Sequence, residues 1–297
     1  MLGAPKLFTG ATLDVIDTSA RFDRAKLQVV RITAEAVPQQ ALADLVEGAR
    51  LYGLWSRLAF HDIRQRFRRS VLGPFWLTLS MGIMIGAMGL VFSTLFHQDI
   101  AQTLPYIATG IIFWTMLITC ITEGTATFIS AESTIRNVPM PVSVHFYRMM
   151  ARNVFIWLFN MVIYLAILVV FRVMPGWGMI LFVPGFVLFL VNVSWMSLAA
   201  AILSTRYRDI PPIISNFIQV VFYITPVFWS PAIMSGRMTL LVDANPFYHL
   251  LAIVRDPLLG DLPPPASWAS CAGLAIVGIG VTTWLYRRAH ARIAYWV

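Results

Sequence analysis

Long apolar runs constrain this chain more than any other feature of its sequence. A helix needs about 20 mostly apolar residues to cross the hydrocarbon core of a membrane. Six runs near that length follow residue 73, at about 74–96, 104–130, 151–173, 177–204, 213–229 and 267–286. Only 12% of the residues are charged, against about 25% in a soluble domain. We therefore expect an all-α integral membrane protein with six transmembrane helices, of which 213–229 is the shortest and contains Pro226.

Arginine is concentrated beside every second connection between these runs. The connections 97–103, 174–176 and 230–266 hold only Arg237 and Arg255, whereas the other flanks hold clusters of arginine. By the positive-inside rule, the arginine-rich flanks face the cytosol. Both termini are then cytosolic, in agreement with an even number of spans. This predicts a multi-pass protein of a bacterial inner membrane, and we expect no nucleic-acid partner.

Several motif classes are missing from the sequence. Cys120 and Cys271 both lie inside apolar runs, where cysteine acts as a small packing residue. There is no CxxC or HExxH spacing, so we expect no metal site and no catalytic residues of those kinds. A GxxxxGK[ST] phosphate loop is also missing, so the chain cannot hydrolyse ATP by that chemistry.

The residues before the first span divide into two parts, which gives three predicted regions in all. Residues 1–50 form a cytosolic N-terminal extension, 51–72 an amphipathic interface helix, and 73–297 the six-span domain. In the second region a basic face opposes an apolar stripe. The basic face holds Arg57, His61, Arg64 and Arg68, and the stripe holds Leu51, Leu54, Trp55 and Leu58. Such a helix is either an anchor on anionic lipid or a basic doorway for a phosphate-bearing lipid substrate.

The segment 66–76, RFRRSVLGPFW, resembles the signature of the membrane subunit of polysaccharide-exporting ABC transporters, which serve O-antigen, capsule and teichoic acid export. Further matches follow in the order of that family and extend the resemblance over roughly residues 50–297. They are Asn153, the YRDI of 207–210, the TPVFW of 225–229, the NPF of 245–247 and the RDPLLG of 255–260.

This resemblance implies a transport subunit and not an enzyme. Two copies would form a homodimer around a polymer channel, driven by two separate nucleotide-binding ATPase subunits. ATP and Mg would bind to those partners, and this chain would need no cofactor. The substrate would be an undecaprenyl-pyrophosphate-linked or other lipid-linked glycan, exported from the cytosol across the inner membrane, with membrane lipid as the surrounding partner.

The resemblance also assigns roles at the cytosolic side. The headgroup would enter beside Arg64, Arg68, Arg69, Leu72 and Gly73. The loop after the second span would contact the ATPase, with Glu132, Ser133, Arg136, Asn137, Met140, Pro141, His145 and Arg148 as contact residues. A plain solvated loop is the alternative for any one of these. Glu123 is expected to pair with an arginine of the entry region such as Arg69, or to reach the interface.

Two further features belong to the channel and its outer end. The family carries a periplasmic re-entrant pair of gate helices between spans five and six, which here places an outer gate at Asn245, Pro246, Phe247 and Tyr248; an external cap without gating is the alternative. Aromatic rings of the first, second and fifth spans would guide the glycan, with lipid-facing or core packing as the alternative. They are Phe75, Trp76, Phe113, Trp114, Phe128, Phe222, Tyr223 and Trp229.

Three competing functions remain open at this point. An ABC permease for a smaller lipid or drug would share the same architecture. A membrane-embedded glycosyl- or acyltransferase should show clustered acids or a histidine at a membrane face, whereas Asp99, Glu123 and Asp209 lie on distant segments. A passive channel should show a selectivity-filter sequence, and none is recognisable.

Overall fold

The computed structural model describes residues 40–68, 73, 75–172, 176–229, 231 and 237–297. Within these ranges the chain is all-helical and contains no strand. Five helices are long and apolar enough to cross a membrane. They are α3 (Phe75–Leu95), α4 (Ile100–Ser130), α6 (Ser143–Phe171), α7 (Phe182–Arg206) preceded by the 3-10 turn η1 (Trp177–Leu181), and α11 (Pro265–Trp296). The chain is therefore a multi-pass membrane protein.

The fifth apolar run forms a shorter helix than the sequence suggested. Here α8 (Ile210–Ile224) has 15 residues, which at 1.5 Å per residue is about 22 Å and less than the roughly 30 Å of a bilayer core. It ends at Ile224 because the next residue, Thr225, precedes Pro226, and a residue before proline avoids helical backbone angles. Residues 225–229 continue as non-helical chain.

Two other helices are longer than the runs that predicted them. The sequence pattern begins a span at residue 151, but α6 begins at Ser143 and includes the polar residues before that run. Likewise α11 continues past residue 286 to Trp296. Neighbouring residues define two other helix ends. At the start of α4, the Asp99 carboxylate accepts a hydrogen bond from the Ala101 N–H (3.0 Å). At the end of α6, Arg172 has a left-handed backbone conformation with a φ of 53°.

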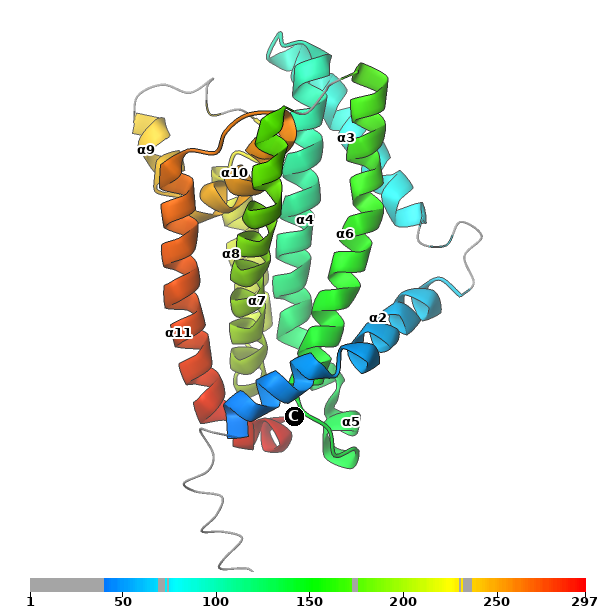
Figure 1. The fold of residues 1–297 in the computed structure, drawn as a ribbon, viewed down its shortest axis with the longest axis vertical. Helices are drawn as coiled ribbons and strands as arrows, with labels where there is room; N and C mark the ends of the chain where they lie inside the picture. The colour runs from blue at the N-terminus through cyan, green and yellow to red at the C-terminus, as the bar shows by residue number, and fades with distance from the viewer. Residues whose placement is uncertain (1–39, 69–72, 74, 173–175, 230, 232–236) are drawn as a thin grey trace, which may run out of the picture.

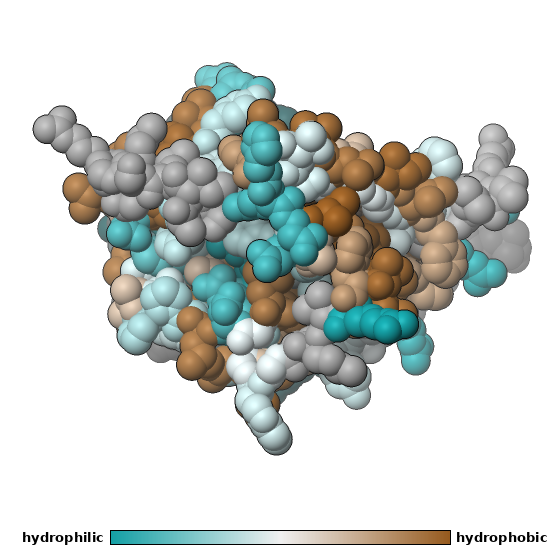
Figure 2. All heavy atoms as spheres, turned by 90° about the horizontal axis from the view of Figure 1, so that it is seen from above, coloured by the Kyte–Doolittle hydropathy of each residue, from teal (hydrophilic) through white to brown (hydrophobic). Residues whose placement is uncertain are grey.

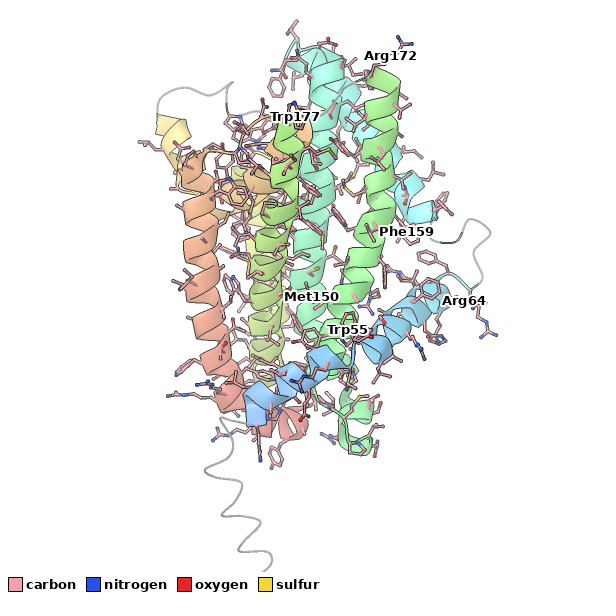
Figure 3. The ribbon with its side chains drawn as sticks, viewed as in Figure 1. Trp55, Arg64, Met150, Phe159, Arg172 and Trp177 are labelled. Carbon is pink, nitrogen blue, oxygen red and sulfur yellow. The ribbon has the colours of Figure 1, made fainter. Side chains whose placement is uncertain are left out.

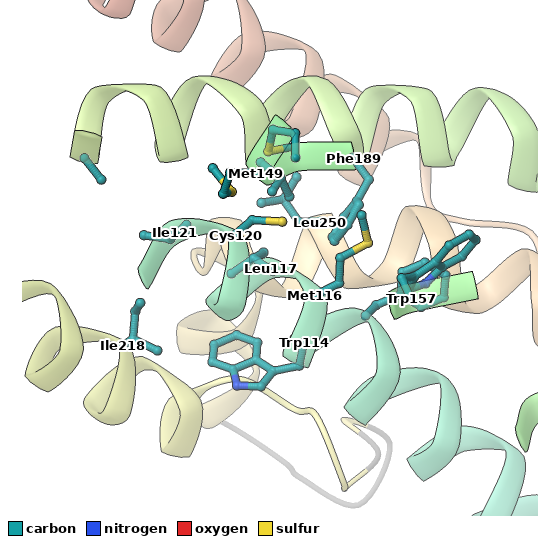
Figure 4. Packing of buried hydrophobic residues seen from close by; sticks show 14 of the residues in the cluster. Trp114, Met116, Leu117, Cys120, Ile121, Met149, Trp157, Phe189, Ile218 and Leu250 are labelled. Atoms are coloured by element: carbon teal, nitrogen blue, oxygen red, sulfur yellow. The ribbon is translucent and has the colours of Figure 1, made fainter. Parts of the chain in front are cut away.

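In the bundle, α4 is the central helix, and α6 and α7 pack against it (Figure 1). On its far side α7 packs against α11. One close approach explains the α4–α7 contact, because a Cβ on Gly124 would lie 2.7 Å from the Ser197 carbonyl oxygen. Figure 4 shows the resulting core, with Leu117 and Cys120 of α4 next to Leu250 and with Trp157 and Phe189 beyond Met116.

Short helices cover the two ends of the bundle. At one end lie a helical segment at 40–50, α2 (Tyr52–Arg66) and α5 (Glu132–Asn137) (Figure 1). At the other lie α9 (Arg237–Asp243) and α10 (Pro246–Leu259), where hydrophilic and hydrophobic residues mix (Figure 2). These two helices occupy the segment in which the sequence predicted a pair broken at 245–246.

The segment 40–50 packs on the folded body, whereas the sequence pattern predicts that it belongs to the N-terminal extension 1–50. Ala41 is fully buried and Asp44 is 8% exposed. Gly48 lies so close to Ser143 of α6 that a Cβ there would collide with the serine hydroxyl. The rest of the predicted extension, 1–39, lies outside the described residues.

Candidate entry and coupling sites

Helix α2 packs on α6 through a narrow stripe. Ala59 is fully buried and Ile63 is 4% exposed, and the Trp55 ring lies 6.1 Å from the Tyr147 ring of α6. The predicted basic residues Arg57, His61, Arg64 and Arg68 are all exposed. Of the predicted apolar stripe, Leu51 and Leu54 stay more than one third exposed. A surface with leucine beside arginine suits the boundary between lipid tails and headgroups.

A hollow of about 810 Å³ opens at the end of α2 that points away from the bundle. It brings together three predicted entry residues, Arg64, Arg68 and Gly73, and adds Phe159 of α6, which lies on the same side of the bundle as Arg64 (Figure 3). Its other lining residues are Phe60, His61, Ile63, Gln65 and Phe67. Arg69 and Leu72 lie outside the described residues. The combination of two guanidinium groups with aromatic rings suits a ligand that is anionic at one end and apolar at the other.

A chain of ion pairs joins α2, α6 and α4. Asp62 of α2 accepts hydrogen bonds from two arginines of α6, from Arg148 Nε (2.7 Å) and Nη2 and from Arg152 Nη1 (3.1 Å). Arg152 Nη2 also donates to Glu123 Oε2 of α4 (2.7 Å), and Asn153 Nδ2 donates to the same oxygen (2.8 Å). Three helices are thus held together by polar contacts of partly buried groups.

These contacts give Glu123 a partner and add one residue. Among the described residues Glu123 pairs with Arg152 of α6, and the arginine named from the sequence, Arg69, lies outside the described residues. Asp62 was not singled out from the sequence, although it is the acid on which both α6 arginines converge. Burial raises the pKa of Asp62, but the hydrogen bond and charge of Arg148, together with Arg152, lower it more, so the net pKa is below its ordinary value. The carboxylate is therefore charged at neutral pH.

The predicted ATPase-contact segment divides into an exposed part and a buried part. Glu132, Ser133, Arg136 and Asn137 are exposed on α5, and Met140 and Pro141 are half-buried in the turn that follows. His145 and Arg148 instead lie in α6, because that helix begins at Ser143. His145 is 5% exposed and Arg148 is paired with Asp62, so neither belongs to the exposed surface of α5.

Asp44 fixes the start of α6, directly after this turn. Its carboxylate accepts hydrogen bonds from the N–H groups of Val142 (2.8 Å) and Ser143 (3.0 Å) and from the Tyr286 hydroxyl of α11 (2.6 Å). His290 Nε2 lies 3.3 Å away. Burial raises the pKa of Asp44, but the hydrogen bonds from His290, Tyr286 and Ser143 outweigh it and lower the pKa to about 2. A charged carboxylate at a helix N-terminus is also favoured by the helix dipole.

The predicted channel aromatics fall into two groups. Phe113 and Phe128 are fully buried and Trp114 is 4% exposed, because α4 is surrounded by other helices. Phe113 packs among rings of α6 and α7. Its ring centroid lies 5.6 Å from that of Trp157 and 5.6 Å from that of Phe189. Phe113 and Phe128 therefore act as core packing, and they offer no face to a polymer. The other group is at least partly exposed and consists of Phe75, Trp76, Phe222, Tyr223 and Trp229.

At the opposite end, α10 holds the non-helical segment 225–229 in place. Asn245 caps α10 by accepting from the Phe247 N–H (2.9 Å), and its amide donates to the Thr225 hydroxyl (2.9 Å). Arg255 is 2% exposed and donates from Nη1 to the Pro226 carbonyl (2.8 Å). Of the four predicted outer-gate residues, Asn245 is buried, Pro246 is exposed, and Phe247 and Tyr248 are half-buried.

Comparison with known proteins agrees with this architecture. A family model described as ABC-2 type transporter matches residues 54–259. The O-antigen export system permease protein RfbA of Myxococcus xanthus is 22% identical over 218 residues, which cover 71% of this chain and 84% of that protein. A protein of the same name from Klebsiella pneumoniae is 22% identical over 214 residues, covering 69% of this chain and 80% of the relative.

Proposed function

The chain belongs to the ABC-2 type transporter family, and from that premise we propose that it is the membrane subunit of an exporter of lipid-linked polysaccharide of the O-antigen type. The hollow beside Arg64 and Arg68 carries this proposal. A lipid-linked glycan has a pyrophosphate between its lipid tail and its first sugar, and guanidinium groups bind phosphate oxygens through paired hydrogen bonds. The family match and the names of the two relatives support the same substrate class.

The topology that we propose places α2 and α5 in the cytosol and α9 and α10 on the periplasmic side of a bacterial inner membrane. Both termini are cytosolic, because the arginine-rich flanks lie at the end that carries α2. The fifth of six spans is α8 together with residues 225–229. In this arrangement α9 and α10 form a re-entrant outer gate, with protein groups satisfying their backbone.

The working unit in this proposal is a homodimer bound to two ATPase subunits, which hold ATP and Mg. Exposed α5 contacts the ATPase, and its movement reaches the start of α6 through the short turn at 138–142. From α6 the ion pairs of Arg148 and Arg152 connect to Asp62 on α2. ATP-driven closure thus acts on the helix that lines the headgroup hollow, and the glycan then advances past the half-buried rings of Phe222 and Trp229.

ATPase activity tests the proposal directly. The chain is purified with its ATPase subunit in lipid nanodiscs and assayed with and without an undecaprenyl-pyrophosphate-linked glycan. We expect the glycan to stimulate the activity. The double variant R64E/R68E should lose this stimulation by about tenfold or more, since each charge-assisted contact is worth about 1.5–3 kcal/mol.

The matched control for that variant is R57E. Arg57 is exposed on the same helix but does not line the hollow, so this charge reversal should leave stimulation near the wild-type level. Equal loss in R57E and R64E/R68E would mean that α2 is only a lipid anchor. Assembly without any response to the glycan would move the substrate assignment to a smaller lipid or drug.

A further inference from the structure

A second cavity lies at the end of the molecule opposite α5, where the α3–α4 turn meets residues 226–229 and the end of α10. Its volume is about 370 Å³, within the size range of roughly 300–1,000 Å³ that is usual for small-ligand sites. None of the entry or coupling residues described above contributes to it. Among the described residues that line it there is no arginine, lysine or histidine, so these residues supply no cationic group for a phosphate.

One side of the cavity is formed by aromatic rings. Phe96, Tyr106, Phe228 and Trp229 line it, and all four are half-buried. Such rings keep part of their surface available to a ligand. Aromatic faces carry negative charge density, and the C–H face of a pyranose ring is apolar and slightly positive, so the two surfaces stack well.

The other side of the cavity carries amide, hydroxyl and carboxylate groups that can form hydrogen bonds. Gln98, Gln102 and Thr103 come from the α3–α4 turn and the first turn of α4, and Asp261 follows α10. Each amide offers two donors and an acceptor, and a carboxylate accepts only. Neighbouring hydroxyl groups of a sugar both donate and accept, so this set matches a neutral sugar.

The aromatic side is held rigidly before any ligand arrives. The Tyr106 hydroxyl donates to the Trp229 carbonyl (3.1 Å), and the Arg255 guanidinium lies 4.1 Å over the Tyr106 ring. Arg255 also binds the Pro226 carbonyl. A preorganised site loses less entropy on binding.

Aromatic packing connects this cavity to the interior. The Trp114 ring lies 5.6 Å from Phe222, Phe222 lies 5.6 Å from Phe228, and Phe228 lies 4.8 Å from Phe92. Phe92 in turn stacks on Phe96 at 5.7 Å. The cavity thus lies at one end of a continuous set of rings that come from α4, α8, the non-helical segment 225–229, α3 and the turn after α3.

We propose that this cavity binds a neutral sugar residue, stacked on Trp229 and Phe228 and hydrogen-bonded by Gln98 and Gln102. The assignment rests on the proposed function, in which this end faces the periplasm and the sugar belongs to the exported polymer. The site holds sugar by its ring and hydroxyl groups, in contrast to the phosphate chemistry at Arg64 and Arg68.

Thiol protection tests the site, because the chain has only two cysteines and both are buried: Cys120 is 0% and Cys271 1% exposed. A cysteine introduced by A101C lies in the cavity at a residue with no proposed contact to the sugar, and one introduced by L262C lies outside it at a position that is 71% exposed. Both variants are assembled with the ATPase subunit in nanodiscs and labelled with a maleimide. The probes are lipid-free O-polysaccharide fragments of a few repeat units and, for comparison, inorganic pyrophosphate.

We expect at least one fragment to slow labelling of A101C several-fold and to leave L262C unchanged, and pyrophosphate to protect neither. A direct binding measurement on W229A should show affinity reduced several-fold, with W229F close to the wild type. Equal protection by pyrophosphate would overturn the assignment. Absence of protection by every fragment would also overturn it, and if lipid-linked glycan still stimulated the ATPase, the proposed function would stand without this site. Protection without ATPase stimulation would keep the sugar site and remove the export function.

Discussion

Arg152 on α6 lies within hydrogen-bond distance of acids on two different helices, 3.1 Å from Asp62 of α2 and 2.7 Å from Glu123 of α4. One guanidinium therefore ties the interface helix to the central helix of the bundle. The geometry uses the planar fork of arginine, since Nη1 and Nη2 donate to different carboxylates.

Removing this guanidinium should separate the two helices. In R152Q, Asp62 keeps Arg148 and Glu123 keeps Asn153, but the link between them is lost. We expect destabilisation of about 2 kcal/mol, between the values for exposed and buried ion pairs, seen as a lower Tm of the purified subunit. Coupling should suffer as well, so that basal ATPase activity remains while glycan stimulation falls. R57Q is the control, and an equal Tm for R152Q and R57Q would contradict this prediction.

Asp44 should make stability depend on pH. Its pKa is depressed from 3.8 to about 2 in the folded state, so its contribution is complete above about pH 4 and is lost as the pH falls towards 2. The size is roughly 2 kcal/mol. D44N should therefore lower the Tm at pH 7, and the difference from the wild type should shrink in scans at lower pH. E47Q, on the same segment at an exposed position, should change little; a pH-independent deficit in D44N would refute the charge argument.

Gly110 should not tolerate a side chain. A Cβ at this position would collide with the Val227 carbonyl oxygen, which belongs to the backbone and cannot swing away. We expect G110A to lower stability by about 2 kcal/mol or more, as overpacking does. Gly273 of α11 has no atom within 4 Å of an added Cβ, so G273A should be neutral or stabilising by up to about 1 kcal/mol. Thermal unfolding of the two variants side by side decides the point, and equal effects would argue against close packing at Gly110.

Arg255 should not be replaceable by lysine. It is 2% exposed, it donates to the Pro226 carbonyl, and its guanidinium carbon lies 4.1 Å from the centroid of the Tyr106 ring. Lysine keeps the charge but has neither the planar stack nor the fork. R255K should cost about 2 kcal/mol of stability, measured as a Tm shift. It should also weaken sugar protection of A101C, because Tyr106 and Trp229 lose their support. An unchanged Tm would show that charge alone is sufficient there.

The apolar runs predicted the five long helices because hydropathy is a local property of the sequence. The apolar runs did not predict those helix ends that are set by contacts with residues far away in the sequence. The start of α6 at Ser143 depends on Asp44, which is 99 residues away in the sequence, and no local pattern contains that contact. The shortness of α8 was visible in Pro226, whose effect on the preceding residue is local.

The same contrast between local and long-range contacts applies to the site residues. Clustering of Arg64, Arg68 and Gly73 was predictable, because they are neighbours in the sequence. The partner of Glu123 was not, since an acid on one span can meet arginines from several others. The one available signal was the spacing of Arg148 and Arg152, four residues apart and hence on one face of a helix; that spacing suggests a shared acidic partner but does not identify Asp62.

The Asp44 contacts also bear on the order in which the chain folds. Asp44 and Tyr286 are 242 residues apart in the sequence. Four of the five long helices lie between these two residues, and the fifth, α11, contains Tyr286. Helices of a growing chain enter the membrane in order, so the segment 40–50 emerges first and finds its full set of partners only when α11 is in place. The contacts of Asp44 with Val142 and Ser143 can form once α6 is present, whereas its contact with Tyr286 forms only after the last span has packed.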